Sequence, residues 1–322
     1  MNFDYNEEQQ LLADSVRRFL AKDYDFETRR KIVASQEGWS APVWATLAEM
    51  GVTGLPLPAD CDGFGGGAVD LMGVMEAFGE ALVVEPYLAT VMAARLVARA
   101  GNEAQQRAIL PQVVAGKLRF AFAHGERGAR YNVAQVKTEA KAAAGGWTLN
   151  GEKVVVLGAP LADKIVVSAR TAKGVSLFVV DRSALGVKAY RTLDQMRAGD
   201  VTLASVRVAA DALLGGEGEA LPLIEEATDF ATALVCAEAV GAMKFACDTT
   251  LEYLKTRKQF GVPIGTFQAL QHRMVDMFVA YEQARSMACL ACSKVDSSTD
   301  PKDRARAVSA DKMKGVRDAV RI

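Results

Sequence analysis

The chain has 322 residues, half of them hydrophobic, and its 38 lysines and arginines against 39 aspartates and glutamates give a formal net charge of −1. This length and apolar content are sufficient for two or three packing units. The near-neutral balance argues against a nucleic-acid-binding protein, which usually carries a basic excess or stripe. It also argues against a disordered chain, which would be rich in charge and poor in apolar residues.

The sequence shows no sign of a membrane span, a secretory signal or a metal site. No run of about 18 apolar residues is present, and the polar, acidic residues 1–8 are unlike a signal peptide. Five cysteines, a sparse and odd set, indicate reduced thiols in the cytoplasm. Cys289 and Cys292 form a CxxC pair within an apolar helical pattern, with no second pair nearby. We therefore expect buried thiols rather than a zinc or redox site.

The first third of the chain, residues 1–117, is predicted to be a helical domain. Apolar residues recur every three or four positions over 6–22, and Asn6 is placed to cap this helix. Further helical patterns cover 26–35, 42–50, 68–82, 86–100 and 104–115.

The pattern changes at about Leu118, and residues 118–212 are predicted to form a β domain. Glycine-containing turn signals, among them Asn150-Gly151, separate short segments rich in alternation and β-branched residues. These segments are 147–150, 153–156, 165–167, 175–180 and 201–208. Short, evenly spaced strands without long helices between them favour an antiparallel sandwich or barrel.

Helical patterns return in residues 213–322, over 218–256, 266–296 and 302–322. The last pattern reaches Ile322 without a capping signal, so either the gene product ends bluntly there or the sequence is truncated. Helices, then strands, then long helices predict an α+β fold of three parts.

The most distinctive stretch, residues 257–268, joins two of the long helices. Arg257 can grip a pyrophosphate with its planar fork of donors. Phe260 can cover an aromatic base, and Gln268 can satisfy amide or hydroxyl edges. The alternative is an ordinary helical corner whose basic cluster is favoured by the helix dipole.

Residues 253–272 resemble the acyl-CoA dehydrogenase family, in which the motif reads approximately R-x-x-F-G-x-x-(I/L)-x-x-x-Q. Leu149-Asn150-Gly151-Glu152-Lys153 resembles the L-N-G-x-K of the same family, and the order of the three blocks matches over essentially the whole chain. The chain is similar to divergent bacterial members, including subunits for pimeloyl-like, steroid or aromatic-acid thioesters. The resemblance implies an FAD-dependent enzyme that desaturates acyl-CoA thioesters and passes electrons to an electron-transfer flavoprotein.

The resemblance also implies which residues contact the flavin. Arg257, Phe260 and Gln268 would contact the FAD of a neighbouring subunit, so a homodimer or homotetramer is expected, or a heterotetramer with a second dehydrogenase subunit.

Residues 120–132 take the place of the family's T-E-P-x-A-G-S-D loop. The resemblance implies flavin contacts there at Phe122, His124 and Gly125, and a substrate contact at Tyr131. His124 is interpreted as a packing or hydrogen-bonding group rather than a base. Gly125 stands where the family has a threonine, so the hydroxyl contact to FAD is lost.

Two further flavin contacts differ from the family pattern. Val155 replaces the usual tryptophan that shields the flavin, and Leu157 replaces the usual threonine. The side-chain part of the flavin site is therefore reduced, whereas backbone contacts can persist.

The resemblance does not identify a catalytic base in this chain. Most relatives carry a glutamate in a segment that would lie beyond Ile322, and others carry it at the position of Ala231, which cannot accept a proton. Glu238 lies seven residues further on, close to the same helix face but roughly 10 Å away. A buried carboxylate with a raised pKa fits both a base and a paired structural glutamate, and we expect a structural role.

Asp229 matches a family aspartate near the CoA chain, with a helix-cap or surface role as the alternative. Three functions stay open. The leading one is an acyl-CoA dehydrogenase with its base on a C-terminal segment. The others are a non-catalytic subunit that completes a partner's FAD site, and a flavin oxidase or monooxygenase of the same fold.

Overall fold

The computed structural model describes residues 5–320, which divide into two compact units. We call them the helical unit (Met1–Phe26, Gly67–Val83 and Asp229–Ile322) and the mixed unit (Glu27–Gly66 and Val84–Thr228). Each unit draws on segments that are far apart in the sequence.

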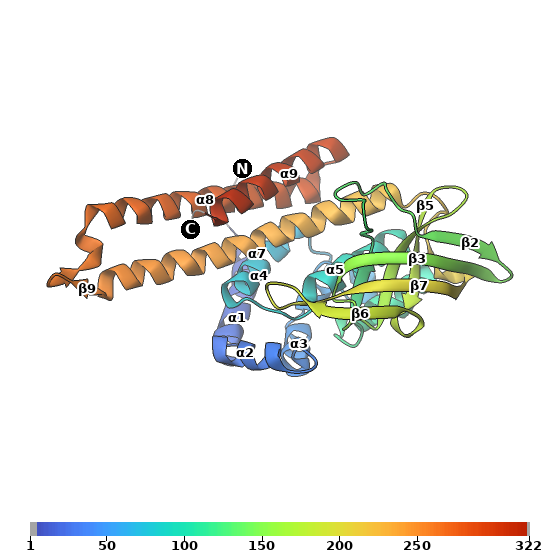
Figure 1. Ribbon diagram of the computed structural model, residues 1–322, viewed down its shortest axis with the longest axis horizontal. Helices are drawn as coiled ribbons and strands as arrows, with labels where there is room; N and C mark the ends of the chain where they lie inside the picture. Colours follow the sequence, from blue (N-terminus) through green and yellow to red (C-terminus); the bar gives the residue numbers. More distant parts are fainter. Residues whose placement is uncertain (1–4, 321–322) are drawn as a thin grey trace. The chain divides into compact units, whose positions relative to one another are not determined.

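The helical unit contains the most extended helices of the chain (Figure 1). Its described helices are α1 (Glu7–Asp23), α4 (Ala68–Ala81), the greater part of α7 (Leu221–Thr256), α8 (Gln268–Ser297) and α9 (Pro301–Ala319). Two short strands, β9 (Lys258–Gln259) and β10 (Val262–Pro263), and the 3₁₀ turn Ile264–Thr266 connect α7 to α8. Four alanines of α8, spaced three or four residues apart, are buried, which permits close helix packing.

Local and long-range contacts define the helix ends in this unit. Asn6 caps α1 as predicted, and its side chain and that of Gln9 form a reciprocal capping box. The start of α4 is capped from α8, because the Asp296 carboxylate accepts from the amides of Ala68 at 2.8 Å and Val69 at 2.9 Å. A negative charge at this end also complements the helix dipole.

The mixed unit combines four helices with an eight-stranded sheet. The helices are α2 (Phe26–Ala34), α3 (Ala41–Glu49), α5 (Tyr87–Ala100) and α6 (Glu103–Val114). The strands are β1 (Phe120–Ala123), β2 (Glu139–Ala143), β3 (Gly146–Leu157), β4 (Lys164–Arg170), β5 (Val175–Asp181), β6 (Gly186–Arg191), β7 (Arg197–Ala209) and β8 (Leu213–Leu214). Their order is β6-β7-β3-β2-β4-β5-β8, with β1 paired to β4.

The sheet is mainly antiparallel, as the turn pattern predicts, but β1 runs parallel to β4. The β2–β3 hairpin lies between these two strands in the chain, so the connection from β1 to β4 is long. No local turn signal in the sequence could indicate this pairing.

The predicted turn at Asn150-Gly151 is wrong, because both residues lie within the single strand β3. The register against β7 shifts between Leu149 and Gly151, as in a β-bulge. The Asn150 side chain accepts from the Ser205 amide at 2.8 Å, which satisfies a group left out of the ladder. Asn150 and Gly151 therefore form part of a β-bulge within one strand rather than a turn between two strands.

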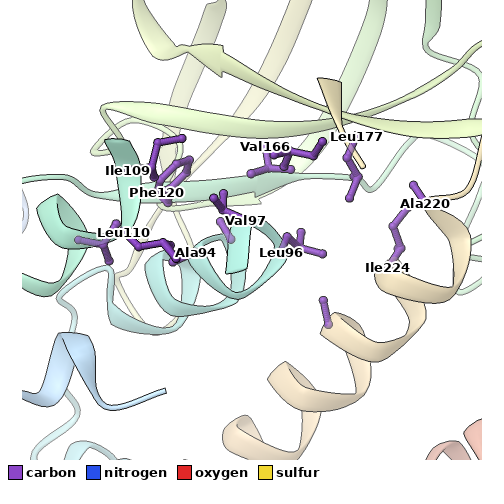
Figure 2. Close-up of a cluster of buried hydrophobic side chains, with 14 of the residues drawn as sticks. Ala94, Leu96, Val97, Ile109, Leu110, Phe120, Val166, Leu177, Ala220 and Ile224 are labelled. Atoms are coloured by element: carbon purple, nitrogen blue, oxygen red, sulfur yellow. The ribbon is translucent and has the colours of Figure 1, made fainter. Parts of the chain in front are cut away.

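Two apolar clusters cover the faces of β1 and β4. Phe120 and Val166 join residues of α5, α6 and the start of α7, including Leu96 and Ile224, in the cluster shown in Figure 2. Their neighbours Ala121, Ile165 and Val167 point to a second cluster formed by the strands and their connections. Because successive side chains point to opposite faces, both faces of these strands are buried. Strand β1 is therefore rigidly held where it leads into the 124–138 loop.

Helix α7 is the one described segment that is long and apolar enough to cross a membrane. Within its most apolar window, however, 56% of the residues are buried inside the protein, as in the core helix of a soluble protein.

Candidate functional site

A buried ion pair lies directly after β1. Lys153 of β3 is fully buried, and its Nζ donates to Glu126 Oε1 at 2.7 Å. The other Glu126 oxygen accepts from the Lys137 amide at 2.7 Å, and Oε1 also accepts from the Thr138 amide and hydroxyl. These donors hold the pKa of Glu126 at about 2 although burial alone would raise it. The pair thus fixes both ends of the loop between β1 and β2.

His124, which we interpret from the sequence as a packing or hydrogen-bonding group rather than a base, belongs to the same buried network. Its Nδ1 lies 2.9 Å from Ser168 Oγ, and its ring stacks on Phe122 with centroids 5.5 Å apart. Lys153 Nζ donates to Ser168 Oγ at 2.9 Å, which leaves the serine proton free to point at Nδ1. Burial and the Lys153 charge lower the pKa of His124 to about 4, so the ring is neutral at pH 7.

Next to this network, β3 presents an exposed apolar edge. Val155 and Leu157 are 59% and 38% exposed, and the register against β7 shifts between Lys153 and Val156. Val155 has a φ of +53°, a left-handed conformation that is unfavourable for a β-branched residue. Such strain is retained where the surroundings impose it, and it is often found at functional sites.

Asp200 of β7 holds this strained position. Its Oδ1 accepts from the Val155 amide at 3.2 Å and from the Tyr190 hydroxyl at 3.0 Å, while Oδ2 pairs with Arg127 at 3.2 Å. The Val155 amide and these partners lower the pKa of Asp200. In the same region the Val154 amide donates to the Gly125 carbonyl at 2.8 Å, so the loop after β1 is joined to the exposed edge of β3. The structure thus brings Gly125, Val155 and their supports together in the mixed unit.

Tyr131 lies further along the loop and is fully exposed. No hydrogen bond, ion pair or ring contact with residues 5–320 orients its ring, in contrast to the network at the two ends of the loop. Its predicted substrate contact stays a prediction.

The tip of the α7–α8 hairpin lies next to the label β9 in Figure 1. Arg257, Phe260 and Gln268 of this tip are exposed. Phe260 is 92% exposed, with a φ of +53°, and touches Phe267 edge-on at a centroid distance of 6.2 Å. Within residues 5–320 the Arg257 guanidinium makes no hydrogen bond or ion pair, although the Arg257 backbone bonds to Tyr253 and Ile264. A strained, exposed aromatic beside an uncommitted cation is a surface suited to an external partner.

Asp229 and Glu238 lie on α7. The Asp229 carboxylate accepts from Arg304 Nε of α9 at 2.8 Å, and both side chains are largely buried. The backbone of Glu238 lies against Gly79 of α4, where an added Cβ would come within 1.8 Å of the Glu238 carbonyl oxygen. Glu238 therefore lies at a tight helix crossing, and Ala231 lies on the same helix.

The Glu126–Lys153 pair and its link to Ser168 were not predicted from the sequence. Both charged residues lie in stretches that match family motifs, and these matches were the signal from which the ion pair could have been predicted. A buried lysine needs a carboxylate partner, so two motif charges near a buried strand could have been paired. No group of three or more histidine, cysteine or acidic residues within the described chain could hold a metal ion.

Models of the three acyl-CoA dehydrogenase domains match this chain: the N-terminal domain over residues 6–117, the middle domain over 121–208 and the C-terminal domain over 219–322. The acyl-CoA dehydrogenase FadE12 of Mycobacterium tuberculosis is 29% identical, and the match covers 93% of this chain and 80% of FadE12. The L-prolyl-[peptidyl-carrier protein] dehydrogenase of Pseudomonas fluorescens is 30% identical, with 94% of this chain and 82% of that protein covered.

Solved structures agree with these matches. PigA with FAD and proline has a TM-score of 0.88 at 27% identity, with 99% of this chain and 88% of PigA covered. The Tcur3481-Tcur3483 steroid acyl-CoA dehydrogenase variant has a TM-score of 0.84 at 30% identity, with 97% of this chain and 86% of that chain covered.

Helical, β and helical blocks in this order, each matched by the corresponding domain model, define a protein of the flavoprotein dehydrogenase class. The chain belongs to the acyl-CoA dehydrogenase family, whose members are FAD-binding oxidoreductases that act on CH–CH groups.

Proposed function

We propose that this chain is an FAD-dependent acyl-CoA dehydrogenase that desaturates an acyl thioester between Cα and Cβ. The proposal rests mainly on the hairpin tip, where the Arg257 guanidinium makes no hydrogen bond or ion pair with residues 5–320 and Phe260 is 92% exposed. An arginine is suited to a diphosphate and an exposed aromatic to a flat ring. In the family, the residues of this tip contact the FAD that is bound to a neighbouring subunit. The proposal therefore includes an oligomer.

The residues of the mixed unit fit the other side of the flavin. Val155 and Leu157 offer an exposed apolar surface for the ring, and the adjoining Gly125 is exposed and carries no side chain. His124 would contribute through its backbone, because its neutral side chain is turned to Ser168. When bound, FAD supplies the acceptor for the β-hydrogen. Glu126 and Lys153 hold the loop that carries these contacts.

Residues for the substrate are proposed at two places. Tyr131 lies on the exposed loop after β1, and Asp229 forms a pair with Arg304 that could adjust to a charged CoA group. We assign no catalytic base among residues 5–320, and Glu238 is proposed to be structural because its backbone lies at the α4–α7 crossing.

A second candidate, a non-catalytic subunit of a heteromeric dehydrogenase, is supported by particular residues. Val155, Leu157 and Ala231 lack the side-chain functions that relatives use for the flavin and the proton. The Tcur3481-Tcur3483 relative is itself named as a pair of proteins. In either case we propose a cytoplasmic protein whose electrons pass to a flavoprotein carrier, and whose assembly is a homodimer, a homotetramer or a heterotetramer.

The test is to purify the chain alone and measure its bound FAD from the visible spectrum, then add acyl-CoA thioesters of graded size without oxygen. A yellow protein whose flavin is bleached by one thioester class supports the dehydrogenase. A colourless chain that becomes yellow only with a partner supports the second candidate. Absence of FAD in every assembly contradicts both. Rapid oxygen uptake with substrate would instead identify an oxidase or monooxygenase.

A further inference from the structure

The mixed unit contains a basic pocket whose lining includes none of the residues assigned to the flavin. Its volume is about 670 Å³, and it is formed by the connection between α2 and α3, the start of β1 and the ends of β6 and β7. Four arginines line it, whereas Glu37 is the acidic residue of the lining. The arginines are Arg119, Arg182, Arg191 and Arg197.

Arg197 forms a fixed wall of this pocket. Its Nη2 donates to the Ser35 carbonyl at 2.8 Å and to the Gln36 carbonyl at 3.4 Å, just after the end of α2. Gly38, with a φ of +70°, allows this approach, since a Cβ there would lie 2.0 Å from Arg197 Nε. The guanidinium is therefore held in one orientation before any ligand arrives.

Arg119 forms a second fixed wall. Its Nη2 bonds to Asp163 Oδ1 at 3.1 Å and its Nε to Oδ2 at 3.3 Å. Its Cζ lies 4.3 Å from the centroid of the Trp39 ring, which is a cation–π contact. Trp39 can therefore serve as a fluorescence probe of ligand binding in this pocket.

The remaining two arginines are uncommitted. The side chains of Arg182 and Arg191 make no hydrogen bond or ion pair with residues 5–320. Burial and the nearby charge of Arg191 lower the pKa of Arg197, so these two cations lie close to one another. Gathering like charges in this way is unfavourable unless an anion joins them.

We propose that this pocket binds a small molecule that carries a diphosphate group, of the nucleoside diphosphate class. Planar guanidinium forks match phosphate oxygens, and two free arginines beside a fixed third suit two adjacent phosphates. A volume of about 670 Å³ accommodates a nucleotide-sized ligand and greatly exceeds a single phosphate. The pocket is thus a site for a second ligand, separate from the residues assigned to the flavin.

The test is calorimetric titration of the FAD-loaded protein with ADP, pyrophosphate, adenosine and malonate, together with Trp39 fluorescence. We expect ADP and pyrophosphate to bind, adenosine and malonate to bind at least tenfold more weakly, and FAD to stay bound. Arg182→Gln and Arg191→Gln should each weaken ADP binding about tenfold or more, because a charge-assisted contact is lost. Arg107→Gln, an exposed arginine of α6 paired with Glu103, is the matched control and should leave ADP binding unchanged.

Several results would overturn the proposal. These are malonate binding as tightly as ADP, an equal loss in Arg107→Gln, or release of FAD by ADP, which would place the nucleotide in the flavin site. Trp39→Phe serves as the fluorescence control. If this variant loses the fluorescence change on ADP addition but still binds ADP in the calorimeter, ADP binds in the pocket beside Trp39. Arg191→Lys keeps the charge but not the planar fork, so its binding of ADP should lie between those of wild type and Arg191→Gln.

Discussion

Among single residues, His124 shows how a buried network determines a protonation state. Its ring lies between Phe122 and Ser168, and Lys153 supplies a nearby positive charge. Burial and this charge lower the pKa of His124 from 6.5 to about 4. In the unfolded chain the ring is protonated below about 6.5, so between these two pH values the unfolded state binds more protons and stability falls as the pH falls.

We therefore expect His124→Gln to reduce the loss of stability between pH 6.5 and pH 4. Glutamine retains hydrogen-bonding groups for Ser168 but does not titrate. The difference between the two proteins should reach roughly 3 kcal/mol at most. Urea unfolding at matched FAD content measures this difference, and parallel stability curves for the two proteins would contradict the expectation.

Arg257 is the residue on which the proposed shared flavin site depends most. Replacement of Arg257 by alanine should weaken FAD binding and oligomer stability together, by about 1.5–3 kcal/mol, because one charge-assisted contact is lost. Lys258→Ala is the control, since Lys258 is an exposed cation of the same tip. The measurements are flavin content after gel filtration and the oligomer mass. Unchanged values for Arg257→Ala would exclude the proposed role.

Among the structural elements, the crossing of α4 and α7 is the tightest contact in the helical unit. A Cβ added at Gly241 would lie 1.9 Å from the Glu76 carbonyl oxygen, and one added at Gly79 would lie 1.8 Å from that of Glu238. A Cβ atom at either position would clash with the carbonyl oxygen, so only glycine fits at these two positions. The two helix backbones therefore touch directly.

Gly241→Ala is expected to lower the free energy of unfolding by about 1–3 kcal/mol, because the helices must separate to admit the methyl group. Gly315→Ala on α9 is the control. An added Cβ there meets no atom within 4 Å, and the gain in helix propensity should stabilise by up to about 1 kcal/mol. Chemical unfolding of both variants tests the contrast. Equal stabilities for the two variants would show that the crossing can relax.

At the scale of the whole molecule, the proposed assembly and the cofactor should depend on one another. With Val155 and Leu157 in place of an aromatic shield and a hydroxyl, FAD would be held by backbone groups and by the hairpin tip of another subunit. We expect FAD to be lost on dilution in step with oligomer dissociation. Flavin retained by a dilute monomer would contradict the shared site.

The double variant Val155→Trp with Leu157→Thr should slow this loss of FAD. A shielding aromatic buries up to about 150–250 Å², and a hydroxyl adds a hydrogen bond of about 0.5–1.5 kcal/mol. Tryptophan is also not β-branched, so the φ of +53° should be less unfavourable for it than for valine. Leu193→Trp, in a turn where Leu193 is 98% exposed, is the control and should not change FAD retention.

Features that depend on near neighbours were predictable from the amino-acid sequence. The order of helical, β and helical blocks follows from periodicity, and the start of α1 follows from the capping residue Asn6. The displayed tip at Arg257 and Phe260 was predictable from its motif. In each case the residues that matter lie within a few positions of one another.

Contacts between distant positions became known from the folded chain alone. It pairs β1 with β4 in parallel, joins Lys153 to Glu126, and brings Arg197 to the end of α2 across about 160 residues. It also gives Asp229 a partner, Arg304, that is 75 residues away. No local pattern specifies such pairs, because their stability comes from burying apolar surface across the whole unit and from satisfying the charges that this burial traps.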